Sequence, residues 1–73
     1  MSIKDEKISE CKAALNVATL ADKRARAEYI LAEAAYKAGA SYGVLDSAIS
    51  ESQHASRQLR IAQARYEAAL KLP

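Results

Sequence analysis

The sequence predicts an all-α fold, an antiparallel two-helix hairpin, and two observations carry this prediction. Residues 2–38 and 44–72 contain no glycine or proline and are rich in strong helix formers, and the chain has 17 alanines among its 73 residues. Both glycines fall between these stretches, in the segment KAGASYGVLDS. A short connection between two long helices normally makes them antiparallel neighbours, so we expect a turn over residues 39–43. The rival interpretation is one long helix kinked at the glycines.

Capping residues mark both ends of the first predicted helix. Ser2 is a candidate N-cap, and Asp5 and Glu6 follow in the first turn, where carboxylates favour the positive end of the helix dipole. Lys37 lies in the last turn and Gly39 follows it, as expected of a glycine that ends a helix with a positive φ.

The second predicted helix has a single apolar seam. Its N-cap is Ser41 or Asp46, and Pro73 follows its end. Apolar and small residues recur at alternating steps of three and four, the spacing of a coiled coil. The seam consists of Leu45, Ala48, Ser52, Ala55, Leu59, Ala62, Tyr66 and Ala69.

The first predicted helix has two such rows, nearly half a turn apart. The first stripe consists of Ile8, Cys11, Leu15, Ala18, Asp22, Ala25, Tyr29, Ala32 and Tyr36. The second stripe consists of Ala13, Val17, Leu20, Arg24, Ala27, Leu31, Ala34 and Ala38. A helix in a two-helix hairpin needs only one apolar face, so the second stripe predicts a further partner. Alternatively, the second stripe reflects helix propensity alone and faces water. This alternative explains the alanines better than it explains Val17, Leu20 and Leu31, which each gain by burial.

Length and composition support an incomplete core. A chain of this size without Trp or Phe buries little apolar area, so we expect the hairpin to be completed into a bundle by self-association or by a helical protein partner. The predicted function is non-catalytic protein binding, as a small helical chaperone or assembly adaptor. The predicted partner-binding residues are Val17, Leu20, Ala27, Leu31 and Ala34.

Three isolated polar residues have structural explanations. Asp22 interrupts the first stripe, either as a register-setting acid paired with Arg57 or Arg60 across the hairpin or as a partly exposed acid. Cys11 lies on the first stripe, where a free cysteine acts as a small hydrophobe. His54 lies off the seam and is expected to be exposed, far from Cys11 in an antiparallel hairpin.

Charge favours a protein partner over a nucleic acid. The chain has 11 basic and 9 acidic residues, a formal net charge of +2, whereas nucleic-acid binders usually carry a strong basic patch. The alternative function is a homodimeric four-helix-bundle regulator that binds RNA or DNA through Lys23, Arg24 and Arg26. Asp22 and Glu28 flank these residues, which makes a solvated face with intrahelical ion pairs the simpler interpretation.

The sequence lacks the motifs that indicate several other kinds of function. There is no glycine-rich phosphate loop, paired-carboxylate motif or metal-ligand spacing, so we expect no enzyme activity, cofactor, metal or small-molecule substrate. No apolar run reaches 18 residues, which argues against a membrane span. The single cysteine suits the reducing cytoplasm, where we expect the protein to act.

Two families of short helical hairpins share this pattern. The segment KAGASYGVL, with Gly39, then Tyr42, then Val44 and Leu45, is similar to the turn of the small co-chaperone subunits that guard type III secretion needle proteins. That resemblance implies a cytoplasmic hairpin that binds a larger helical-repeat partner and helps to hold the needle subunit monomeric. The alternating small and large residues also resemble the core layers of a plasmid RNA-binding hairpin whose dimer forms a four-helix bundle.

Overall fold

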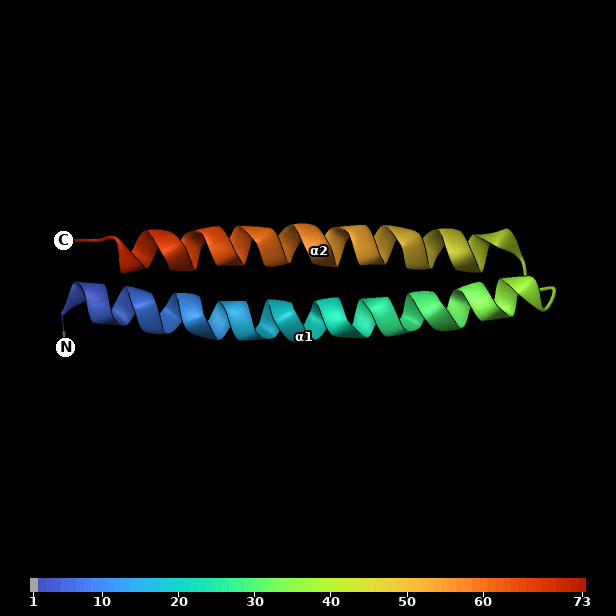
Figure 1. Cartoon of the computed structure of the whole chain (residues 1–73), viewed down its shortest axis with the longest axis horizontal. Coiled ribbons are helices and arrows are strands. Elements are labelled where there is room, and N and C mark those ends of the chain that lie inside the picture. Colours follow the sequence, from blue (N-terminus) through green and yellow to red (C-terminus); the bar gives the residue numbers. More distant parts are fainter. Residues whose placement is uncertain (1) are drawn as a thin grey trace.

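Two long helices, α1 (Ile3–Lys37) and α2 (Tyr42–Leu70), make up nearly the whole chain. In this computed structural model, which describes residues 2–73, the helices run side by side in opposite directions (Figure 1). The start of α1 and the end of α2 lie at the same end of a rod whose Cα atoms span 55 × 14 × 11 Å. The predicted antiparallel hairpin is confirmed, and the alternative of one kinked helix is wrong.

Both ends of α1 are capped as the sequence predicts. The Ser2 hydroxyl oxygen accepts a hydrogen bond of 3.2 Å from the backbone N–H of Asp5. At the other end Gly39 has a φ of 109°, which its lack of a Cβ allows. The N–H of Ala40 donates to the carbonyl of Ala35 at 2.9 Å, and the N–H of Gly39 donates to that of Tyr36 at 3.1 Å. These two bonds form a Schellman motif, which satisfies the last carbonyls of α1.

The second helix begins earlier than predicted and ends earlier too. Its N-cap is Ser41 rather than Asp46, with an extended backbone (φ −67°, ψ 150°) and no capping bond from its side chain. Gly43 therefore lies in the first turn of α2 and not in the connection. An edge-to-face contact of the Tyr36 and Tyr42 rings, with centroids 5.7 Å apart, ties the start of α2 to the end of α1. At the C-terminal end, α2 ends at Leu70 with Lys71 as its C-cap, and Pro73 disfavours helical φ and ψ at Leu72.

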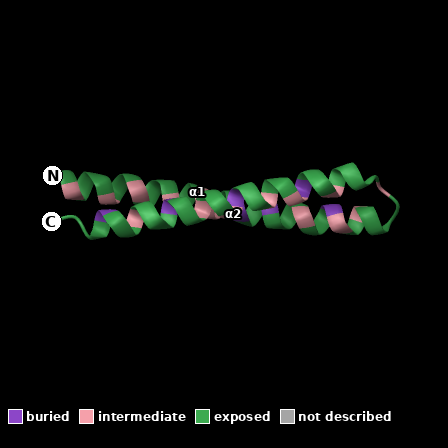
Figure 2. Cartoon of the chain, turned by 90° about the horizontal axis from the view of Figure 1, so that it is seen from above, coloured by how far each residue is buried: buried purple, intermediate pink, exposed green. Residues whose placement is uncertain are grey.

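The first stripe of α1 faces the seam of α2, and the contact is built mainly from alanine. Residues of both rows are buried or half-buried throughout, except Tyr36 at the turn. Figure 2 shows buried positions as short bands along helices that are otherwise largely exposed. The buried apolar residues are Ala25, Ala32, Ala48, Ala55, Ala62 and Ala69.

Alanine determines how much this core can stabilise the hairpin. In α2 it recurs every seven residues, and a small side chain at one of the two core positions lets the helix backbones approach closely. The larger core residues, such as Leu15, Leu59 and Tyr66, are consequently only half-buried. A buried methyl group contributes only about 0.8 kcal/mol, so the core between α1 and α2 is thin.

Candidate protein-interaction surface

Asp22 lies inside the contact between the helices, with only 5% of its surface exposed. The Ser56 hydroxyl of α2 donates a 3.0 Å hydrogen bond to its Oδ1, and Arg26 Nε of α1 lies 2.9 Å from its Oδ2. The predicted pairing with Arg57 or Arg60 and the alternative of a partly exposed acid are therefore both wrong. The register-setting role predicted for Asp22 stays a prediction, now with Ser56 as its partner on α2.

The second stripe lies on the side of α1 that faces away from α2. Val17 is 68% exposed, Leu20 56% and Leu31 70%, and Ala27 and Ala34 are exposed as well. Helical geometry explains this placement, because positions offset by half a turn from the first stripe point away from whatever the first stripe contacts. All five predicted partner-binding residues are therefore accessible on one face. Burying such side chains is favourable by roughly 25 cal/mol per Å² of apolar surface.

Further exposed apolar side chains border this face, and sequence reasoning missed them. Ile30 is exposed beside Leu31 on α1, and Ile61 is partly exposed on α2. The exposure of Ile30 could have been predicted from the sequence, because Ile30 lies outside the first stripe and directly before Leu31 of the second stripe. Ile61 lies one residue before the buried Ala62, on the flank of the seam.

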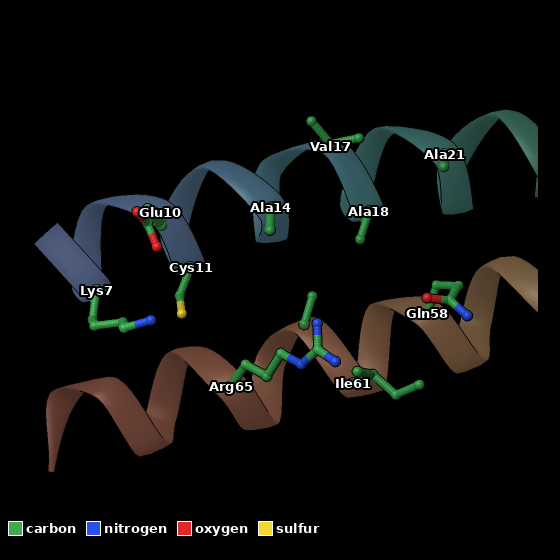
Figure 3. Close-up of a pocket in the computed structure, with 11 residues that line it drawn as sticks. Lys7, Glu10, Cys11, Ala14, Val17, Ala18, Ala21, Gln58, Ile61 and Arg65 are labelled. Atoms are coloured by element: carbon green, nitrogen blue, oxygen red, sulfur yellow. The ribbon is translucent and has the colours of Figure 1, made fainter. Parts of the chain in front are cut away.

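A shallow groove of about 710 Å³ runs between the helices next to the second stripe, near the end of the hairpin away from the turn. It exists because alanines lie where longer side chains would fill the space between α1 and α2. In Figure 3, Ala14 and Ala18 point from α1 toward α2, while Val17 points away from α2. The eleven lining residues are Lys7, Glu10, Cys11, Ala14, Val17, Ala18, Ala21, Gln58, Ile61, Ala62 and Arg65. Val17 thus belongs both to the groove and to the second stripe, which joins the two surfaces.

Cys11 and His54 are not brought together. Cys11 is a half-buried free thiol that points toward α2 from the groove wall. His54 is exposed, as predicted, and is not among the residues that line the groove. Across residues 2–73 the structure places no three potential metal-ligating side chains together.

The three basic residues of the nucleic-acid alternative do not form one patch. Lys23, Arg24 and Arg26 are all exposed. Lys23 and Arg26, three residues apart, are neighbours on one side of α1, whereas Arg24 is turned by about 100° from Lys23 and points to another side. Arg26 is paired with Asp22, and Arg24 belongs to the second stripe. A smaller polar hollow of about 440 Å³ lies on α2, lined by Ser52, Gln53, Ser56, Arg57 and Arg60.

Glu33, which is half-buried, and Glu51, which is exposed, have opposite electrostatic surroundings. Glu33 and Lys37 form an ion pair of 3.1 Å along α1, and the hydrogen bond and charge of Lys37 lower the pKa of Glu33. On the other flank, the carboxyl group of Glu51 of α2 lies beside that of Glu28 of α1. That contact and the charge of Glu28 raise the pKa of Glu51. A like-charge pair therefore joins the helices on the side of Glu28.

Comparisons with known proteins do not assign this chain to a family. No protein-family model, no curated protein and no solved structure matches it. Within the part of the chain that the structure describes, neither helix is long and apolar enough to cross a bilayer.

Proposed function

We propose that this chain is a non-catalytic interaction module that presents the second stripe of α1 to a helix of another polypeptide. Such a role is that of a small helical chaperone or assembly adaptor acting in the cytoplasm. A place as co-chaperone of secretion needle subunits belongs to the same proposal, and the hairpin architecture is its only support.

The observation that carries the proposal is the contrast between the two sides of α1. The side that contacts α2 buries alanines, whereas the opposite side exposes Val17, Leu20 and Leu31. Leucine and valine each gain about 1.5–3 kcal/mol on full burial, far more than alanine does. The outer side of α1 therefore carries large apolar side chains whose burial would still be favourable. They lie in a row that is spaced for packing against another helix.

The test compares Leu20→Asp and Leu31→Asp with the wild-type chain in extracts of the native host. Because both leucines are more than half exposed in the hairpin, each change should alter the free energy of unfolding by no more than about 0.5 kcal/mol. Each should remove the assembly that the tagged wild-type chain forms, measured as the mass of the complex by size-exclusion chromatography with light scattering.

Ser50→Asp is the matched control, because Ser50 is exposed on α2 outside the seam and the groove. This variant should retain the assembly. If Leu20→Asp and Leu31→Asp form the same complexes as the wild type, the second stripe is not a binding surface and the proposal is wrong.

A further inference from the structure

Resting on the proposed function, we propose that the second stripe is covered by a second copy of this chain. The two α1 helices pack antiparallel about a two-fold axis that passes between Arg24 and Ala27. Two hairpins joined in this way bring four helices into one assembly with α1 helices at its centre.

The spacing of the second stripe fits this arrangement. Steps of four and three run symmetrically outward from the axis, so each stripe position meets a stripe position of the second copy. Leu20 then packs against Leu31 of the second copy, and Val17 packs against Ala34 of the second copy. Pairing the large residues with one another or with alanine leaves no large residue opposite a charged one.

Arg24 is the only charged residue in the second stripe, and the arrangement supplies a partner for it. In this register Arg24 lies opposite Ala27 of the second copy, next to Glu28 of the second copy. Arg24 and Glu28 are four residues apart, so they share one side of α1, and antiparallel packing brings that side of each copy together. The two-fold axis makes the ion pair twice.

Both residues are free to make this contact. Across residues 2–73, neither Arg24 nor Glu28 forms an ion pair within 4.0 Å, although they are spaced for one along α1. Glu28 instead lies beside Glu51 of α2, a second acidic side chain. An arginine from a second copy would neutralise Glu28 and relieve this repulsion, which is charge complementarity between two surfaces of the same chain.

The size of the contact sets the conditions of the test. The second stripe extends over 26 residues, or roughly 38 Å of helix, and half of its eight positions are alanine. Such an interface is smaller than a standard one, so the masses should be measured from about 1 μM to about 1 mM, the range of weak association.

The experiment uses two single charge reversals and their mixture, followed by sedimentation equilibrium. Arg24→Glu and Glu28→Arg each place like charges in contact across the axis, so each variant alone should remain at the mass of one chain. In an equimolar mixture, one copy has glutamate at both positions and the other has arginine at both. Both contacts then pair opposite charges, so the mass should double. Circular dichroism on each variant alone checks that the hairpin is folded.

Arg57→Glu is the matched control, because it makes the same charge change on α2 and should keep the wild-type mass. A mixture that stays at the mass of one chain overturns the second-copy proposal. If complexes that depend on Leu20 still form in host extracts, the proposed function stands with a different partner. If those complexes are also missing, both proposals fall.

Discussion

The two faces of α1 have the same spacing of apolar residues but different surroundings, and the difference shows what each face does. The first stripe packs against α2 and its central residues Asp22, Ala25 and Ala32 are buried. The second stripe contains Val17, Leu20 and Leu31, and the structure leaves all three exposed. The fully buried apolar contacts of the hairpin are thus made by alanine, while three large aliphatic side chains remain available outside it.

Each stripe also contains one charged residue, and the two charged residues differ in burial and in their bonding partners. Asp22 is buried, and both of its carboxylate oxygens have a partner. Arg24 is exposed and lies among apolar neighbours on the outer face. A buried charge with its bonds satisfied is suited to setting the alignment of one interface, and an exposed charge without a partner is suited to setting the alignment of another.

Leucine substitutions at Ala25 and Ala27 give the largest expected contrast between the faces. Ala25 is 7% exposed, so Ala25→Leu should force the helices apart and lower the free energy of unfolding by about 1–3 kcal/mol. Ala27→Leu, two residues away on the exposed face, should change it by no more than about 0.5 kcal/mol. Urea denaturation at low protein concentration measures both. Equal losses from the two variants would remove the distinction between the faces.

The pH dependence of stability gives a smaller contrast, between the two flanks of the hairpin. The pKa of Glu51 is raised in the folded chain by Glu28, so its contribution to stability is present at low pH and is lost as the pH rises through the raised pKa. The pKa of Glu33 is lowered by Lys37, so its contribution is present at neutral pH and is lost as the pH falls through the lowered pKa.

Glutamine variants separate these two contributions. Glu51→Gln should raise the thermal midpoint at neutral pH, because it removes the repulsion from Glu28, and should have little effect at a pH of about 3, where carboxyl groups are protonated. Glu33→Gln should lower the midpoint at neutral pH and also have little effect at low pH. Shifts of the same sign at neutral pH would show that these electrostatic assignments are wrong.

Sequence periodicity and the position of the glycines were sufficient to predict the hairpin, the first stripe and the seam, because residues spaced by three and four lie on one side of a helix and those sides pack together. The boundaries at the turn were harder, since Gly43 reads as a turn residue although a glycine costs little in the first turn of a helix. The intrahelical pair of Asp22 with Arg26 agrees with the expected pairing at i and i+4. The partner of Asp22 on α2 was missed, because opposite charge favours Arg57 or Arg60, whereas the side chain that it contacts is Ser56.

The candidate site was predictable in its positions but not in its shape. The exposure of Val17, Leu20 and Leu31 follows from the second stripe, since a helix that packs on one side exposes the other. The adjoining groove did not follow from the sequence pattern, because it arises where Ala14 and Ala21 leave space beside Arg65 and Gln58. Periodicity indicates which side chains face a neighbour, whereas a groove depends on the size of side chains on both helices.

The most direct test of the central idea measures how quickly a thiol on the second stripe reacts with a maleimide. In Cys11→Ser/Ala27→Cys, cysteine replaces an exposed residue of similar size, and Cys11→Ser/Ser50→Cys provides an exposed thiol on α2. If another polypeptide covers the second stripe, the thiol at position 27 reacts more slowly in host extract or at high protein concentration than in dilute solution, while the thiol at position 50 does not. Equal rates at both positions under all conditions would contradict the account.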